Sequence, residues 1–172
     1  SMYKNDKFKI RSTDEIIEDL IKGREYYRQV KRVFLADGDA LIIKTKELVK
    51  ILEAIKTIMP ECERVGIYGS PNSISIKTKE ELLKLRSLGL GIIYLGLESG
   101  SDKVLKYINK GVNSLDMIEV GKKVVDSNIK LSVTLISGIG GRENSMIHAV
   151  ESANILNHMK PDYIGLLTLL LN

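Results

Sequence analysis

The stretch Ile92–Gly96 (IIYLG), followed by Leu97–Asp102 (LESGSD), decides the fold. The first five residues are almost all apolar, which is typical of a strand buried on both faces, as in a parallel sheet. The polar residues and glycine that follow indicate a loop. Ser101 then begins a short helix that ends near Gly111. The stretch therefore predicts one strand, a polar loop and a helix, in that order.

Four similar apolar runs occur elsewhere in the chain and predict four more strands. They are Arg32–Ala36 (RVFLA), Arg64–Tyr68 (RVGIY), Leu131–Ser137 (LSVTLIS) and Tyr163–Thr168 (YIGLLT). Helical patterns with capping residues or terminating prolines and glycines separate the runs. They extend from Ser12 to about Gln29, from a cap at Thr45 to about Met59, from Thr78 to Gly89, from a cap at Asn113 to about Asp126, and from about Asn144 to His158. The alternation predicts one α/β domain over residues 1–172 with a parallel sheet and right-handed crossovers.

Two architectures fit this order of elements: a doubly wound open sheet and a piece of a (β/α) barrel. Five strands are too few to close an eight-stranded barrel. The chain also begins with a helix, whereas both architectures favour a leading strand. We therefore expect the sequence to be a piece of a longer protein.

Composition excludes several classes of function. The only cysteine, Cys62, rules out a disulfide framework and any site built from several cysteines of this chain, and it suggests a reducing, cytoplasmic compartment. No apolar run is long enough to span a membrane. The net charge of +4 is read as lysines dispersed over solvated helix faces, so nucleic acid is not an expected partner. His148 and His158 have no metal-pair spacing and are interpreted as packing or surface residues.

Glycine and polar residues follow each of the first four predicted strands. In both architectures these positions lie at the carboxyl ends of the strands, where ligands bind. Glycine lets the backbone approach a ligand, and helix N-termini attract anions. We call this set the rim and expect it to bind a ligand; its members are Asp37, Gly38, Asp39, Ser70, Asn72, Glu98, Ser99, Gly138, Gly140 and Arg142.

Two patterns within the rim are weak on their own. Gly138, Gly140 and Gly141 match only part of the dinucleotide-binding fingerprint. An open-sheet domain that binds a nucleotide phosphate with this loop is the alternative function. Asp37 and Asp39 more often satisfy backbone N–H groups in a turn than bind a metal.

The segment Gly96–Gly111 (GLESGSDKVLKYINKG) closely resembles a stretch of radical S-adenosylmethionine enzymes, in the branch with the methylthiotransferases and anaerobic coproporphyrinogen oxidases. The resemblance implies a partial, TIM-like (β/α)6 barrel, here with five parallel strands and the first strand missing. It also implies S-adenosylmethionine and a [4Fe–4S] cluster as cofactors. In that family the two generate a 5′-deoxyadenosyl radical, which abstracts a hydrogen atom from the substrate.

The resemblance also implies roles for individual residues. Gly38 and Asp39 occupy the place of an altered Gly-Gly-Glu motif that binds the methionine amino group, and Glu98 matches a contact to the ribose or the amino-acid end of the cofactor. Lys110 suits the methionine carboxylate, and Thr134 lies where relatives often carry an aspartate near the ribose. The remaining candidates for cofactor contact are Asp37, Ser70, Asn72 and Ser99, together with Gly138, Gly140 and Arg142 in an altered Gly-x-Pro-Gly-Glu-Thr loop.

The family's Cys-x-x-x-Cys-x-x-Cys motif, which holds the cluster, is missing from the sequence. Met2–Ser12 looks like the segment that directly follows this motif, so the cluster and the first strand are expected upstream. Cys62 falls at the opposite end of the barrel and is not expected to be a ligand. We therefore expect an enzyme in the parent protein and no activity, and no nameable catalytic side chain, in this sequence.

The substrate is unknown from the sequence, because substrate contacts in the family come largely from outside the core. A non-catalytic partner domain that lost its cysteines is a further alternative. An exposed edge of an open barrel also favours self-association, so some tendency to form a homodimer is expected.

Overall fold

The computed structural model describes residues 11–36 and 38–170, which form one five-stranded sheet with the order β1-β2-β3-β4-β5. All neighbouring strands are parallel. The strands are β1 Arg32–Leu35, β2 Arg64–Tyr68, β3 Leu90–Glu98, β4 Lys130–Ser137 and β5 Tyr163–Thr168. A doubly wound sheet reverses its strand order at a switch point, whereas this order is sequential throughout. The sheet is therefore an open piece of a (β/α) barrel, as expected.

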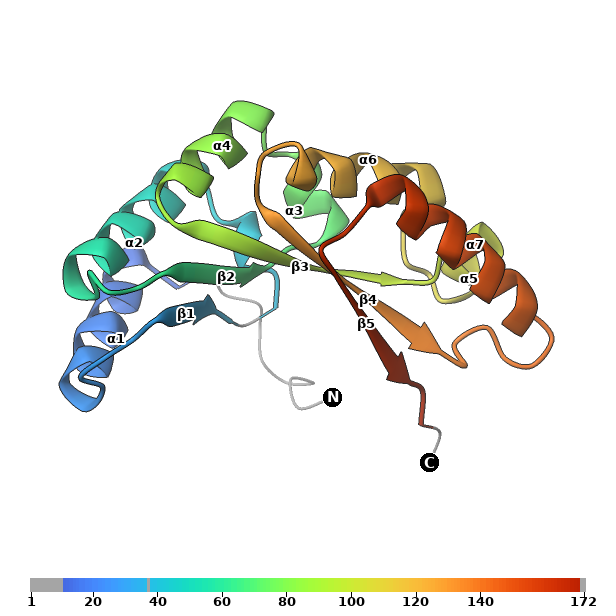
Figure 1. Ribbon diagram of the computed structural model, residues 1–172, viewed down its shortest axis with the longest axis horizontal. Helices are drawn as coiled ribbons and strands as arrows, with labels where there is room; N and C mark the ends of the chain where they lie inside the picture. The colour runs from blue at the N-terminus through green and yellow to red at the C-terminus, as the bar shows by residue number, and fades with distance from the viewer. Residues whose placement is uncertain (1–10, 37, 171–172) are drawn as a thin grey trace.

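The helices lie along one side of the sheet and leave its other side open (Figure 1). They are α1 Thr13–Tyr26, α2 Thr45–Ile58, α3 Pro71–Ser75, α4 Lys79–Ser87, α5 Asp102–Tyr107, α6 Ser114–Val125 and α7 Ser145–Met159, with a 3-10 turn, η1, at Ala40–Ile42. We call the uncovered side the open face. Ligands that reach the sheet without displacing a helix approach from this face.

Three helix starts follow the predicted capping chemistry. Ser12, Thr78 and Asn113 each form a capping box with the residue three positions later. The predicted cap at Thr45 is wrong, because Thr45 is the first helical residue and Lys44 holds the cap position without a side-chain hydrogen bond. Helix α1 also ends at Tyr26, before the predicted end at Gln29.

Two short elements were not predicted, because they lie in segments that look like plain loops. Helix α3 begins after the second strand, where Ser70 caps it and Pro71 occupies its first position. The 3-10 turn η1 follows the first strand. Strand β1 stops one residue earlier than expected, and β3 is longer at both ends.

Apolar side chains from alternate strand positions pack against the helices. In β3 these positions are Ile93, Leu95 and Leu97, each at most 1% exposed. Their neighbours Tyr94, Gly96 and Glu98 are only half-buried and lie on the open face. The expectation of strands buried on both faces holds for residues 65–67, 90–93 and 131–133, and it is wrong for β1, β5 and the carboxyl end of β3.

Strand β5 is exposed on both faces. Ile164, Leu166 and Leu167 are between 56% and 67% exposed, and no strand among the described residues pairs with the outer edge of β5. Homodimer formation through such an edge stays a prediction. In the described part of the chain, no helix is sufficiently long and apolar to cross a membrane.

The contact between Gly100 and α7 generates a first prediction. A Cβ at Gly100 would lie 2.4 Å from Ser152 Cα and 2.6 Å from the Glu151 carbonyl oxygen, so both helix backbone atoms would have to move. Gly100→Ala should lower the free energy of unfolding by roughly 2 kcal/mol or more, measured by urea denaturation.

Gly23→Ala is the matched control, because a Cβ there meets nothing closer than 3.8 Å. Alanine also favours the helix, so this variant should gain roughly 0.5–1 kcal/mol. Equal stabilities for the two variants would contradict the close packing of β3's loop on α7.

Candidate functional site

The loops after β1 and β2 are joined at the rim. Ser70 donates from its backbone N–H to Asp39 Oδ1 at 3.0 Å and from its hydroxyl to Asp39 Oδ2 at 2.5 Å. The same hydroxyl accepts a hydrogen bond from Ser73 N at 3.0 Å and so caps α3. The Asp39 carboxylate thus satisfies a backbone N–H, as expected of a turn residue, and it also places a negative charge at the rim.

A buried lysine beside this pair escaped the sequence analysis. Lys77 is 4% exposed, and its ammonium donates to the Ile43 carbonyl oxygen at 2.7 Å. Burial lowers the pKa of Lys77, while the charges of Glu81 and Asp39 oppose this shift. A lysine in a run with other lysines and glutamates looks like a solvated helix residue, so no sequence signal marked it.

Glu98 occupies a strained turn at the end of β3. Its φ is 63°, and Ser99 N donates across it to the Leu97 carbonyl oxygen at 2.7 Å, which makes a γ-turn with Glu98 at its centre. Lys110 Nζ donates to Glu98 Oε1 at 3.2 Å, and each side chain is 22% exposed. A non-glycine residue in this conformation costs about 1–3 kcal/mol, which makes it a candidate for function.

Gly96 makes room for the Glu98–Lys110 pair. A Cβ at Gly96 would lie 2.5 Å from Glu98 Oε1. Gly96 is also the register partner of Thr134, and Thr134 is the register partner of Gly165. The Thr134 hydroxyl makes no hydrogen bond within the described residues and lies between two positions that lack side chains. The Glu98 carboxylate covers Gly96, so the open face has a gap over Gly165, next to the Thr134 hydroxyl and the Glu98 carboxylate.

Ser99 belongs to the helix side rather than to the rim. Its side chain is fully buried and lies 2.8 Å from His148 Nδ1, and it accepts a hydrogen bond from Ser101 N at 3.0 Å. The Ser99 hydroxyl therefore makes a structural contact with α7, and a cofactor contact by Ser99 stays a prediction. Burial lowers the pKa of His148, which is a packing residue as expected.

The other predicted rim residues lie at the same edge of the sheet, and most of them are exposed. Gly38 has φ of 74° and is exposed, as are the side chains of Asn72 and Arg142. The loop after β4 turns on itself, with Gly141 N donating to the Gly138 carbonyl oxygen at 3.0 Å. Gly140 packs closely, because a Cβ there would lie 3.2 Å from Val104 and Asn144 side-chain carbons. Asp37 lies outside the described residues.

Three aromatic rings cluster on the open face below the rim, and the sequence analysis missed them. The Phe34 ring lies 4.8 Å from Tyr68 and 5.4 Å from Tyr94, and the two tyrosine rings lie 6.0 Å apart, all edge-to-face. The ring of Phe34 lies over Gly66, where a Cβ would be 2.9 Å away. In each strand the aromatic residue alternates with the buried apolar positions, and this pattern could have predicted that the three rings share one face of the sheet.

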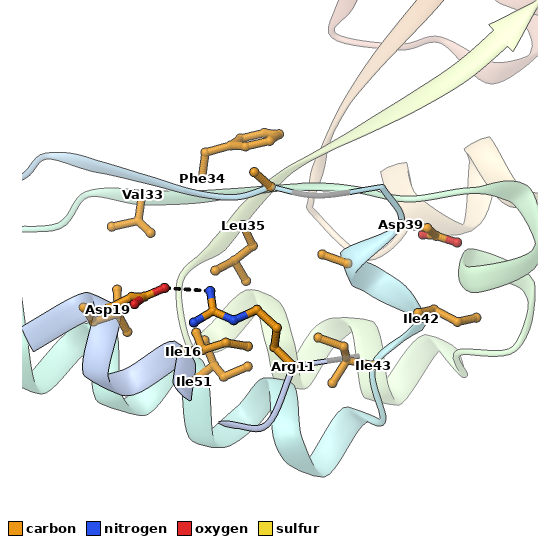
Figure 2. A pocket seen from close by; sticks show the side chains of 13 residues that line it. Arg11, Ile16, Asp19, Val33, Phe34, Leu35, Asp39, Ile42, Ile43 and Ile51 are labelled. Atoms are coloured by element: carbon orange, nitrogen blue, oxygen red, sulfur yellow. Dashed lines mark hydrogen bonds and ion pairs between the residues drawn. The ribbon is translucent and has the colours of Figure 1, made fainter. Parts of the chain in front are cut away.

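A cavity of about 330 Å³ lies on the helix side of β1 and reaches the rim at Asp39 (Figure 2). Aliphatic side chains of α1, β1, η1 and α2 form most of its wall, among them Ile16, Leu35 and Ile51. Its charged groups include Arg11 and Asp19, which pair with each other at 2.6 Å. We interpret it as a gap in the core beside an edge strand, because most of its wall is aliphatic and its Arg11 and Asp19 side chains are paired with each other.

The described residues do not provide a metal centre. No group of three or more His, Cys, Asp or Glu side chains within them could hold a metal ion. Cys62 lies before β2, at the amino end of the sheet, where its thiol contacts the Arg64 carbonyl oxygen at 3.6 Å. It is remote from the rim, as expected.

Comparisons with known proteins give a consistent result. The family model described as the radical SAM superfamily matches residues 1–153. A provisionally named methylthiotransferase of Methanocaldococcus jannaschii is 24% identical over 132 residues, which is 74% of this chain and 29% of that protein. The heme chaperone HemW of Buchnera aphidicola is 22% identical over 142 residues, 80% of this chain and 36% of that protein. The chain therefore spans about a third of the length of these curated relatives.

Solved structures share the fold. Coproporphyrinogen III oxidase from Escherichia coli, a radical SAM enzyme, superimposes with a TM-score of 0.71 at 12% identity, covering 91% of this chain and 36% of that one. Methylornithine synthase also has a TM-score of 0.71, at 16% identity, covering 97% of this chain and 47% of that one. The partial TIM-like barrel is thus confirmed.

The strain at Glu98 generates the second prediction. Glycine adopts a positive φ without cost, so Glu98→Gly should raise the free energy of unfolding by roughly 1 kcal/mol, after the loss of about 0.5 kcal/mol from the partly exposed pair with Lys110. Glu98→Ala loses the same pair and keeps the strain, so it should not stabilise. Thermal denaturation of both variants decides the point, and a less stable Glu98→Gly would refute the strained turn.

Proposed function

Because a superfamily model matches most of its length, the chain belongs to the radical SAM superfamily, and we propose that its rim and open face bind S-adenosylmethionine. The observation that carries this proposal is the gap beside Glu98. There the half-buried Glu98–Lys110 pair adjoins the unpartnered hydroxyl of Thr134, between Gly96 and Gly165. This is the part of the open face where a polar ligand can approach the backbone closely.

The residues present fit the chemistry of S-adenosylmethionine. Its ribose hydroxyls need acceptors and donors, which the Glu98 carboxylate and the Thr134 hydroxyl supply. Its carboxylate needs a cation, which Lys110 supplies. Asp39, held in place by two hydrogen bonds from Ser70, supplies a fixed negative charge for the amino group. The aromatic rings of Tyr68 and Tyr94 offer an apolar surface below these groups.

The chain's own residues bind and orient the cofactor in this proposal. Lys110 and Glu98 come from segments twelve residues apart, and each limits the motion of the other. The γ-turn fixes the carboxylate before a ligand arrives, which lowers the entropy lost on binding. In this family, S-adenosylmethionine together with a reduced [4Fe–4S] cluster supplies a 5′-deoxyadenosyl radical for hydrogen abstraction.

The cluster does not fit the described residues, since a cluster needs several cysteine ligands and the chain has only Cys62. We propose that cysteines outside the 172 residues bind it. We further propose that this sequence alone is inactive and acts as the cofactor-binding core of a radical enzyme. The two alternatives remain a nucleotide-binding domain and a non-catalytic relative.

Measuring the binding of S-adenosylmethionine to the chain tests the proposal that the rim and open face bind this cofactor. Thr134→Val keeps the shape of the side chain and removes the hydroxyl, and Lys110→Gln removes the cation. Each should weaken binding roughly tenfold in isothermal titration calorimetry, the effect of losing one good polar contact.

Lys106→Gln is the matched control for charge, because Lys106 is exposed on α5, away from the Glu98 contact. It should bind the cofactor like the wild type. Tight binding of ATP without binding of S-adenosylmethionine would instead favour the nucleotide-binding alternative.

Reconstitution with iron and sulfide under anaerobic conditions tests the proposal that cysteines outside the 172 residues bind the cluster. The chain extended by its upstream coding sequence should show an absorption band at ~400 nm and cleave S-adenosylmethionine reductively, whereas the 172-residue chain should do neither. An extended chain that binds S-adenosylmethionine but shows no band would favour the non-catalytic alternative.

A further inference from the structure

Three cations gather on the open face at the amino ends of the strands. Arg32 and Arg64 begin β1 and β2 and are register partners, and Lys130 begins β4. Each occupies the alternate position whose neighbours, such as Val33, Val65 and Leu131, pack toward the helices. We call these three residues the cationic floor. Like charges on directly paired strand positions destabilise a sheet, so this arrangement is unfavourable on its own.

The side chains of Arg64 and Lys130 converge on the phenol of Tyr163. Lys130 Nζ donates to Tyr163 Oη at 3.5 Å and lies 5.5 Å from the ring centroid. The hydrogen bond and charge of Lys130, followed by those of Arg64, lower the pKa of Tyr163. Arg64 crosses Gly91 to reach this point, because a Cβ at Gly91 would lie 2.5 Å from Arg64 Cγ. The sheet thus leaves room for a cation to extend across it.

No acidic side chain neutralises the cationic floor within the described part of the chain. None of its three residues forms an ion pair there. Two acids in the segments that enter β2 and β5 have other partners. Glu63 pairs with Lys31 at 3.3 Å, and Asp162 accepts a hydrogen bond from Leu131 N at 2.9 Å. The charge at the floor is therefore available to an anion from outside.

The aromatic cluster lies directly above the floor. Tyr68, Tyr94, Ser132 and Tyr163 are register partners on four neighbouring strands and form one row across the open face. Phe34 contributes the third ring of the cluster, and Phe34, Tyr68 and Tyr163 are each between 41% and 46% exposed. Exposed rings on one face favour a flat, unsaturated ligand that stacks on them.

We propose that the substrate on this face is an acid with a planar, conjugated ring. Its ring lies against Phe34, Tyr68 and Tyr94, and its anionic group is held by Arg64 and Lys130 with the Tyr163 hydroxyl, while Arg32 adds positive charge. This assignment rests on the proposed function, because it places the substrate below a cofactor bound at Glu98 and Thr134. The anionic group is a carboxylate or a phosphate, which both suit these cations.

Titration calorimetry with three small probes tests the assignment on the chain. Naphthoate carries a carboxylate, naphthyl phosphate carries a phosphate, and naphthamide is the neutral counterpart with the same ring. The wild type should bind at least one acidic probe about tenfold or more tightly than naphthamide, since a charge-assisted contact is worth roughly that factor. Whichever acid binds more tightly identifies the anionic group.

The double variant Arg64→Gln/Lys130→Gln should lose that preference and bind all three probes with similar affinity. The double variant Lys106→Gln/Lys122→Gln removes the same charge from exposed positions on α5 and α6 and should retain the preference. Phe34→Leu should weaken binding of all three probes, naphthamide included, because it removes a stacking surface and no charge. Thermal denaturation confirms that each variant is folded.

Two outcomes overturn the assignment: wild-type chain that binds both acids no better than naphthamide, and equal losses of acid binding in the two double variants. Titration of S-adenosylmethionine into the same proteins separates this result from the proposed function. Unchanged cofactor binding in Arg64→Gln/Lys130→Gln supports two distinct subsites. Acid binding that persists when no cofactor binds supports the acid site and refutes the cofactor site instead.

Discussion

The contact between Gly100 and the backbone of α7 determines the position of the Glu98 side chain at the end of β3. The chain after β3 must pass close to Ser152, where it is held by a hydrogen bond from Gly100 N to Ser152 Oγ at 2.8 Å. Ser99 enters the same buried region and meets His148. The direction of the chain must therefore reverse at Glu98, which adopts a positive φ. The carboxylate is thereby returned over Gly96, toward the open face and Lys110.

One face of the sheet forms the aliphatic core, and the other carries the candidate functional groups. The helix-facing positions hold the aliphatic core, so substitutions there act through packing. The open face holds half-buried polar, aromatic and charged groups with few partners of their own. In a closed barrel such interior positions are filled by layers of bulky branched side chains. Here Gly66 and Gly96 admit the Phe34 ring and the Glu98 carboxylate, and Gly165 is left uncovered by other side chains.

The sequence predicted the elements well wherever short-range chemistry decided them. Two capping boxes and the cap at Asn113 marked the starts of three helices, and apolar runs marked all five strands. The choice between an open sheet and a barrel needed the resemblance, because periodicity within a strand carries no information about the order of strands. The candidates Glu98 and Lys110 do lie together. The burial of the Ser99 side chain against α7 could not be predicted, since no local signal marks the positive φ of the preceding residue.

The basic composition takes on a different meaning in three dimensions. Lysines on helices are solvated, which supports the dispersed-charge interpretation for most of them. Arg32, Arg64 and Lys130, however, begin strands, and parallel strands place their first residues side by side. Three charges that are far apart in the sequence thus lie close together and produce a region of positive potential on the open face. The repulsion between these like charges is unfavourable in the free protein. An anionic ligand that bound here would relieve the repulsion, which would favour its binding.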